Sequence, residues 1–217
     1  MVCKPFFFRA VSFFFFLAFF GTDVCLAATV RLNNPKMELE LKAGEVYTGE
    51  VVAENPTEEE VKVKIYLEDW NYMPGGTGEK DFKPVGTTPY SAGNWISFSP
   101  AEDTIKPYGR VVVRYQITVP ENATGAYYSV LFFETALGIA QNEEGANVMV
   151  SGRIGALFFV RISGQMDRSG KIVSVDVKPS QGNAPMEILT TFENSGNIDI
   201  SLGGTFLIMN KDGMVLG

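Results

Sequence analysis

Few side chains in this sequence are suited to catalysis. The chain of 217 residues contains no histidine, and its two cysteines, Cys3 and Cys25, both lie within the first 27 residues. This composition excludes histidine-based nucleophilic triads and ordinary zinc sites, and it excludes thiol catalysis in the rest of the chain. We therefore predict that the protein is not an enzyme and that it uses no cofactor.

Loop carboxylates remain as candidates for acid/base catalysis or for metal binding. The acids in predicted loops are Asp69, Asp81, Glu102 and Asp103. They do not form the spaced pair that a general acid and base require, and no Asp-x-Asp-x-Asp-Gly calcium pattern occurs in the sequence. Three consecutive glutamates at 58–60 point in different directions and are interpreted as part of a solvated loop. We predict no catalytic residue and no metal site.

The first 27 residues have the features of a signal peptide. Lys4 and Arg9 precede an almost wholly apolar run, Phe13–Phe20, and small residues near Ala27 suit cleavage by a signal peptidase. The apolar run is shorter than the roughly 20 residues of a membrane span. We predict export to the periplasm or the cell surface, with a retained N-terminal anchor as the alternative.

The chain after the leader is acidic. The full sequence has 18 basic and 25 acidic residues, and removing Lys4, Arg9 and Asp23 with the leader leaves 16 against 24. Nucleic acids and anionic lipids attract positive surfaces, so neither is an expected partner. Membrane contact is expected only through the leader or through an anchor after Gly217.

Most of the chain after the leader has the pattern of β-strands. Apolar and polar residues alternate in the segments 35–42, 61–67 and 111–119, and Val46–Ala53 is also predicted to be a strand. The segment Tyr127–Phe133 is apolar on both faces, which is typical of a strand at the centre of a sheet. No helix of useful length is predicted after the leader.

The segment Val148–Ile162 is predicted to form one long strand. Gly152 and Gly155 interrupt it and indicate a bend or a bulge. Because strands of this kind need a second sheet to bury their inner faces, the sequence predicts an all-β, immunoglobulin-like sandwich over residues 28–163.

A second β unit is predicted at 165–217. Residues 68–93 and 136–145 of the first unit are expected to be loops, the former rich in glycine, proline and aromatic residues. The second unit is expected to contain four short strands, at 172–177, 186–192, 198–202 and 205–209. Four strands are too few to close an immunoglobulin-like sandwich, so we expect this unit to be an incomplete domain.

The order of these features resembles the N-terminal immunoglobulin-like domain of PapD-like periplasmic pilus-assembly chaperones. The segments that carry the resemblance are Leu39–Val52, Asn55–Thr57, Ser99–Pro100, Ile105–Gly109, Tyr127–Glu134 and Asn147–Arg161. Part of the same region also resembles the first domain of WxL-interacting surface proteins, through Trp95–Pro100, Val119–Asn122 and Gly125–Tyr127. Both resemblances cover residues 29–163 and imply a β-sandwich.

The chaperone resemblance implies a binding site on the late strand. In that family this strand adds to an incomplete subunit, and two basic residues hold the subunit's terminal carboxylate. By the resemblance, Val148, Val150 and Ile154 form the donor face, Arg153 lies near one basic position, and Arg31 is the candidate for the other. The alternative is that the three apolar residues face the protein's own core and that Arg153 is solvated. The implied partner is another exported or surface protein.

Two other functions remain open at this stage. The first is a cell-wall module that binds peptidoglycan or another glycan through Trp70, Tyr72, Tyr90 and Trp95, whose rings would then be exposed and coplanar. The same aromatic residues could instead cap an open end of the sandwich. The second is a structural spacer in a multidomain surface protein, which binds no partner of its own.

Overall fold

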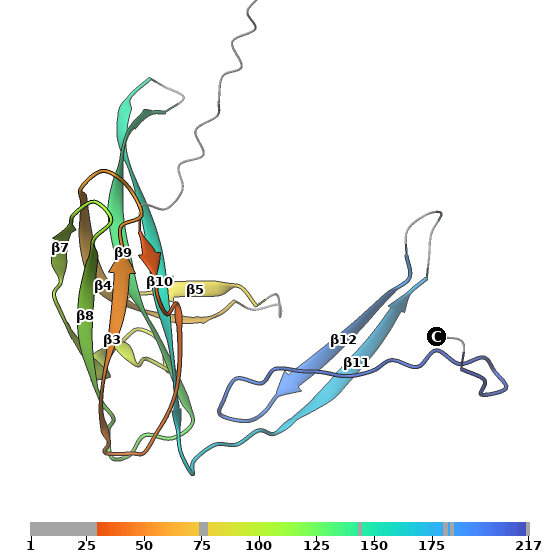
Figure 1. Cartoon of the computed structure of the whole chain (residues 1–217). Coiled ribbons are helices and arrows are strands. Elements are labelled where there is room, and N and C mark those ends of the chain that lie inside the picture. The colour runs from red at the N-terminus through yellow and green to blue at the C-terminus, as the bar shows by residue number, and fades with distance from the viewer. Residues whose placement is uncertain (1–29, 74–77, 143–144, 180–181, 183–184, 216–217) are drawn as a thin grey trace, which may run out of the picture.

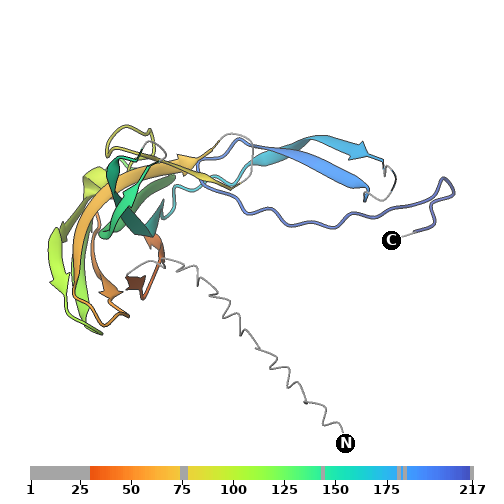
Figure 2. The ribbon, with the colours of Figure 1, turned by 90° about the horizontal axis from the view of Figure 1, so that it is seen from above.

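The structure is a computed structural model that describes residues 30–73, 78–142, 145–179, 182 and 185–215. The predicted signal peptide at 1–27 lies outside the described residues. Two stacked sheets form the body of the molecule, and a separate two-stranded ribbon extends away from them (Figures 1 and 2).

The smaller sheet of the sandwich is antiparallel throughout and has the strand order β1–β3–β8–β6. Its strands are β1 (Arg31–Leu32), β3 (Val46–Glu54), β8 (Arg110–Thr118) and β6 (Ile96–Ser99). In β8 the residues Val111, Val113 and Ile117 are buried, whereas Arg114 and Gln116 between them are exposed. This burial confirms the alternation that the sequence predicted, because successive side chains of a strand point to opposite faces.

The larger sheet has the order β2–β10–β9–β4–β5, and β7 also pairs with β4. Its strands are β2 (Lys36–Leu41), β10 (Asn147–Ile162), β9 (Ala126–Gln141), β4 (Val61–Tyr72), β5 (Lys80–Lys83) and β7 (Glu102–Ile105). All of these pairs are antiparallel except that β2 runs parallel to β10. A short 3-10 helix, η1 (Gly93–Trp95), precedes β6.

The main core lies between the two sheets. Its fully buried side chains include Val113 and Ile117 from the smaller sheet and Phe133, Phe158 and Ile162 from the larger one. The fold is therefore the all-β, immunoglobulin-like sandwich that the sequence predicted.

A second apolar cluster covers the outer face of the larger sheet. Its buried members, which we call the outer cluster, are Trp70, Ala126, Tyr128, Val130, Phe132, Phe159 and Ile198. Six of them belong to β4, β9 and β10, whereas Ile198 comes from the chain after the ribbon. Both faces of β9 are therefore buried over Tyr128–Phe133, which confirms its predicted central position.

Two predicted loops are wrong in part because strands extend into them. β4 continues to Tyr72 and pairs with β5, so the segment 68–93 begins with a hairpin. β9 continues to Gln141 and pairs with β10, so most of 136–145 is strand. The irregularity predicted in β10 is a register shift between Val150 and Ser151, and the extra residue is Leu137 in β9.

The second unit contains two strands rather than four in its described part. These are β11 (Gly170–Lys178) and β12 (Glu187–Asn194), which form an antiparallel ribbon. The segments 198–202 and 205–209, predicted to be strands, run without a paired neighbour apart from one isolated bridge between Met209 and Val215. An apolar pattern alone does not make a strand where no edge lies alongside to accept its hydrogen bonds.

Candidate functional site

The first half of β10 has one edge without a neighbouring strand in the described structure. β10 pairs with β9 from Asn147 to Arg161, but β2 covers its other side only from Leu157 to Ile162. The ten residues Asn147–Ala156 thus leave one side of their backbone open, and we call this side the open edge. With β9 they form a hairpin that projects beyond the rest of the sandwich (Figure 1).

The backbone groups that face the open edge follow from the pairing with β2. The amide of Leu157 donates to the carbonyl of Pro35 at 2.9 Å, on the side away from β9. Because backbone groups alternate in direction along a strand, those of Met149, Ser151, Arg153 and Gly155 also point away from β9. The open edge therefore presents four N–H and four C=O groups in strand geometry.

The predicted donor residues lie together on one face of β10. Val148, Val150 and Ile154 alternate in phase with Ala156 and Phe158, which are buried in the main core. Ile154 packs against that core, whereas Val148 is 40% exposed near the tip of the hairpin. The donor face is thus the outward continuation of the core-facing side of the sheet.

Gly152 interrupts the donor face, but a neighbouring side chain fills its place. A Cβ atom at Gly152 would lie 3.1 Å from Cδ1 of Leu137, the extra residue of the β9 bulge. Leu137 therefore keeps the surface apolar where the glycine lacks a side chain. The predictions missed Leu137, although the apolar residues on either side of the Asn142–Gly145 turn could have indicated a longer hairpin.

Arg153 lies on the opposite face from the donor residues. Its guanidinium donates to Glu68 Oε1 at 2.9 Å and to the Tyr66 hydroxyl at 3.2 Å, and it stacks 4.1 Å from the centre of the Phe132 ring. The hydrogen bond to Tyr66, followed by the charge of Glu68, raises the pKa of Arg153 above its ordinary value. Arg31 is also paired, with Glu54 in the smaller sheet. Both basic candidates are therefore held by groups of this chain.

The outer face of the hairpin carries two large apolar residues that the predictions did not select. Ile139 and Met149 are directly opposite each other and are 71% and 77% exposed. The hairpin is therefore apolar on both faces near its tip.

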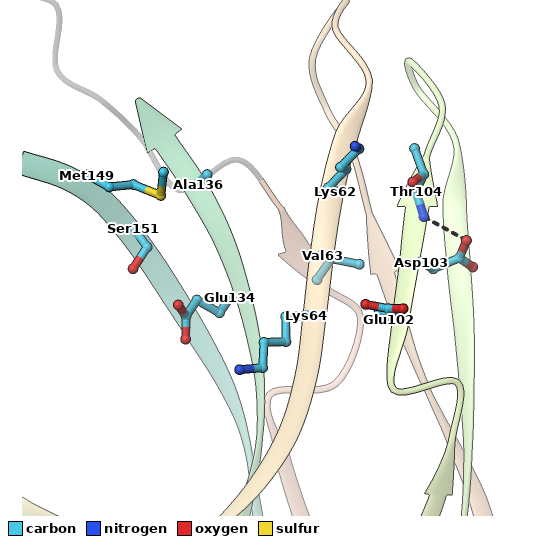
Figure 3. A pocket seen from close by; sticks show the side chains of 10 residues that line it. All are labelled: Lys62, Val63, Lys64, Glu102, Asp103, Thr104, Glu134, Ala136, Met149 and Ser151. Atoms are coloured by element: carbon cyan, nitrogen blue, oxygen red, sulfur yellow. Dashed lines mark hydrogen bonds between the residues drawn. The ribbon is translucent and has the colours of Figure 1, made fainter. Parts of the chain in front are cut away.

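A shallow groove lies beside the hairpin on the same outer face (Figure 3). Met149 and Ser151 of β10 form one side of it, and Glu102 and Thr104 of β7 form the other. Lys62 and Lys64 lie between them, with Glu134 next to Lys64 in the strand pairing. Acidic and basic groups are mixed along this groove, so it has no preference for a charged ligand of one sign.

The structure does not bring the four predicted glycan-binding aromatics onto one exposed surface. Trp70 is fully buried, and its Nε1 donates to the carbonyl of Ser129 at 2.9 Å. Trp95 packs against the main core, with its ring 4.1 Å from that of Tyr127. Neither tryptophan is exposed as the glycan hypothesis requires, because Trp70 lies in the outer cluster and Trp95 lies against the main core.

Tyr72 and Tyr90 remain exposed and line one cleft on the outer face. Asn71 and Thr88 also line it, and Asp199 closes it from the segment after the ribbon. The Thr88 hydroxyl is buried without a hydrogen-bond partner among the described residues. Burial, followed by the nearby charge of Asp199, raises the pKa of Tyr72 above its ordinary value.

The described residues contain no group of three or more His, Cys, Asp or Glu side chains placed to hold a metal ion. No helix within the same ranges has the length and apolar character that crossing a membrane requires.

Known proteins resemble this chain in structure but not in sequence. No family model and no curated protein matches it. It is similar to the class 5 fimbriae chaperone CfaA, with 17% identity, 77% of this chain and 67% of that chain covered, and a TM-score of 0.44. It is also similar to the CsuC–CsuE chaperone–tip adhesion subunit complex of Acinetobacter baumannii (15% identity, 78% of each chain, TM-score 0.44).

A third solved structure is PapD-like domain 7 of human CEP192, with 12% identity, 71% of this chain and 96% of that chain covered, and a TM-score of 0.39. At these identities the similarity concerns the fold. The resemblance to PapD-like domains that the sequence predicted is thus found among solved structures.

Proposed function

We propose that this chain is an exported, non-enzymatic protein that captures another secreted or surface polypeptide by β-strand addition. The observation that supports this function is the open edge of β10 over Asn147–Ala156. An extended segment that docks there gains backbone hydrogen bonds, which supply affinity, and side-chain contacts, which supply specificity. The class of partner we infer is a surface subunit that presents an extended, apolar segment.

The side chains of the donor face define what the captured segment must offer. Val148 and Val150 stand at the end of the hairpin beyond the main core, and Leu137 continues their surface across Gly152. A captured strand would continue the sheet and place its own alternate side chains on the same face. We therefore expect the segment to carry apolar residues at every second position.

A double substitution tests the donor face. Val148→Asp with Val150→Asp places two charges on the face and should abolish capture of polypeptides from an envelope extract of the source cells. The control is Val46→Asp, which changes an exposed valine of β3 in the smaller sheet. Near-ultraviolet circular dichroism should show that both variants are folded. Undiminished capture by the double variant would refute the proposal.

A backbone substitution tests strand addition independently of side chains. Ser151→Pro removes one N–H group that points to the open edge, and proline is tolerated at the edges of sheets. Ser151 contributes little apolar surface, so loss of capture in this variant would identify the backbone as part of the interface. Capture at the level of the parent chain would show that the partner binds elsewhere.

A second candidate function is glycan binding at the cleft of Tyr72 and Tyr90, and it is supported by their exposure in one concave site. Sugar rings stack on exposed aromatic faces and bond to neighbouring amides and hydroxyls. Substituting both tyrosines by alanine should then release the chain from cell-wall polymer. Tyr108→Ala, which removes an exposed tyrosine outside the cleft, is the control. Equal retention of all three proteins would exclude this site.

A further inference from the structure

We propose that the capture site contacts both faces of the captured strand, and that Met149 and Ile139 select a large apolar side chain on the outer face of that strand. This inference rests on the proposed function and adds the residues that decide which extended segments are captured. The occupant is the same polypeptide, which is contacted at positions that the donor face does not reach.

Strand addition at the open edge places captured side chains on the outer face as well as on the inner one. Neighbouring strands of a sheet keep their side chains in phase, so every second residue of a captured strand points outward. These residues lie beside Met149, Ser151 and Arg153, whose side chains are on the outer face of β10. Positions closer to Leu157 are not used, because the carbonyl of Pro35 accepts from the Leu157 amide at 2.9 Å and Pro35 occupies that end.

The three outer positions of β10 differ in their chemistry. Met149 is large and apolar, Ser151 is small and polar, and Arg153 is charged and paired with Glu68 at 2.9 Å. A slip of two residues keeps every captured side chain on its own face, so the apolar donor face alone does not fix the register. A large apolar residue on the outer face does fix it, because among these three positions its only apolar neighbour is Met149.

Ile139 widens the apolar contact at this position. It lies directly opposite Met149 in the pairing of β9 with β10. The backbone groups of Met149 point to the open edge, so the two residues do not exchange hydrogen bonds, and side chains in such pairs lie close together. They have the two highest exposed fractions among the large apolar side chains of the described residues. A captured side chain beside Met149 therefore meets an apolar surface that spans two strands.

The shallow groove on the outer face gives this side chain room to extend (Figure 3). Ser151 and Ala136 are directly opposite each other and form the part of the groove next to Met149. Both side chains are small, and Lys62 and Thr104 lie farther along the groove. A long apolar side chain can thus lie across Ser151 and Ala136 with Met149 along its side, which favours phenylalanine, leucine or methionine over alanine or valine.

Synthetic peptides test this preference on the chain from Ala28 onward, which contains every described strand. The first peptide alternates valine with threonine and carries lysines at its ends for solubility. The second is identical except that its central threonine is replaced by phenylalanine. We expect the second peptide to bind about tenfold more tightly, because a phenylalanine side chain leaves water when it packs on Met149.

A double-mutant cycle assigns this gain to the two residues. In a chain with Met149→Ser and Ile139→Thr, the threonine peptide should bind as it does to the parent chain, whereas the gain from phenylalanine should vanish. The control is Met73→Ser, which removes an exposed methionine at a distance from the hairpin and should keep the full gain. A gain that persists in the double variant would overturn the inference.

Oxidation of Met149 locates the bound side chain without any substitution. Hydrogen peroxide converts accessible methionine to its sulfoxide, and mass spectrometry measures the rate at each residue. The phenylalanine peptide should slow oxidation of Met149 more than the threonine peptide does, and neither should protect the exposed Met73. Equal rates at Met149 with the two peptides would contradict a contact at this residue.

The same measurements separate this inference from the proposed function. If both peptides bind with equal affinity and Ser151→Pro abolishes their binding, strand addition stands and selection by the outer face is refuted. If neither peptide binds, the proposed function is refuted and this inference with it. Tighter binding of the phenylalanine peptide that survives Ser151→Pro would place the peptide elsewhere on the chain and would refute both.

Discussion

Asp199 connects the segment after the ribbon to the larger sheet through two side chains. Arg161 of β10 donates to both carboxylate oxygens, at 2.7 and 3.2 Å, and the Tyr128 hydroxyl donates to Oδ1 at 3.1 Å. Burial raises the pKa of Asp199, but the hydrogen bonds and charge of Arg161, together with the Tyr128 hydroxyl, outweigh it and leave the pKa below its ordinary value. The carboxylate is therefore stabilised in its charged form.

We predict that Asp199→Asn lowers the free energy of unfolding at neutral pH by about 1.5–3 kcal/mol, the range for hydrogen bonds to charged groups. Because the pKa of Asp199 is lower in the folded than in the unfolded state, the stabilisation is present above the unfolded value of about 4 and is lost as pH falls through the folded value. Urea unfolding at neutral and at acidic pH measures the difference between the two proteins.

The matched control for this prediction is Asp81→Asn. Asp81 forms an exposed ion pair with Lys83 at 2.9 Å, and exposed pairs contribute about 0–1 kcal/mol. A difference between Asp199→Asn and the parent chain that stayed constant down to the lowest pH would show that the carboxylate charge is not what stabilises the contact.

At the scale of single strands, β3 and β8 are fitted to each other by a glycine and a tyrosine. Gly49 lies directly opposite Tyr115, and a Cβ atom at Gly49 would collide with the tyrosine hydroxyl. The Tyr115 side chain therefore covers Gly49, an arrangement known to compensate glycine in strands. Its ring also packs edge to face on Phe158, 4.9 Å away, in the main core.

We predict that Gly49→Ala destabilises the protein by about 1–3 kcal/mol, the usual cost of overpacking, because Tyr115 must move. The control is Gly203→Ala, where an added Cβ atom meets nothing within 4 Å. Thermal unfolding followed by circular dichroism should show a lower midpoint for the first variant only. Equal unfolding midpoints would mean that the Tyr115 side chain can rotate away from residue 49 without lowering the stability of the protein.

The sequence predicted most strands of the sandwich because alternation directly reports which side chains are buried. It failed where pairing decides the outcome. In Ala136–Gln141 a bulge at Leu137 interrupts the alternation of apolar and polar residues. The segment is nevertheless a strand, because it pairs with β10. Residues 198–202 show the reverse case, a predicted strand that does not form. They are apolar enough for a strand, but Ile198 is buried in the outer cluster and no strand of the described residues pairs with them.

The candidate site was predictable in its side chains but not in its edge. The long strand was predicted from the sequence pattern, and its donor residues were predicted from the family resemblance. The open edge depends on where β2 begins to pair with β10, and no local sequence pattern indicates that position. The burial of Trp70 was hidden for a related reason. Its segment has the composition of a loop, and only the pairing of β4 with β5 and the outer cluster show that Trp70 is covered.

At the scale of the whole molecule, the outer cluster joins the ribbon to the sandwich. Ile198 is almost fully buried in it, beside the contact of Asp199 with Arg161. Backbone bonds add to this junction, from Ala126 N–H to the carbonyl of Asn197 at 3.0 Å and from Gly125 N–H to that of Gln165 at 3.2 Å. The ribbon should therefore keep a fixed direction relative to the sandwich, as in Figures 1 and 2.

We predict that Ile198→Ala loosens this junction and exposes the outer cluster to water. The chain contains two tryptophans, so Trp95→Phe leaves Trp70, a member of the same cluster, as the single reporter. Loss of a buried isoleucine costs about 2–5 kcal/mol. The main core between the sheets is unchanged, so the sandwich should stay folded. The loss of stability at the junction should shift Trp70 fluorescence to longer wavelength and accelerate proteolysis near 163–169.

The control is Leu202→Ala, which removes an exposed apolar side chain from the same segment. It should leave Trp70 fluorescence and proteolysis unchanged, because Leu202 is not part of the outer cluster. Small-angle X-ray scattering then decides what the junction does. A broader distribution of shapes for Ile198→Ala than for Leu202→Ala would show that one buried side chain fixes the ribbon, and identical profiles would show that the backbone bonds alone are sufficient.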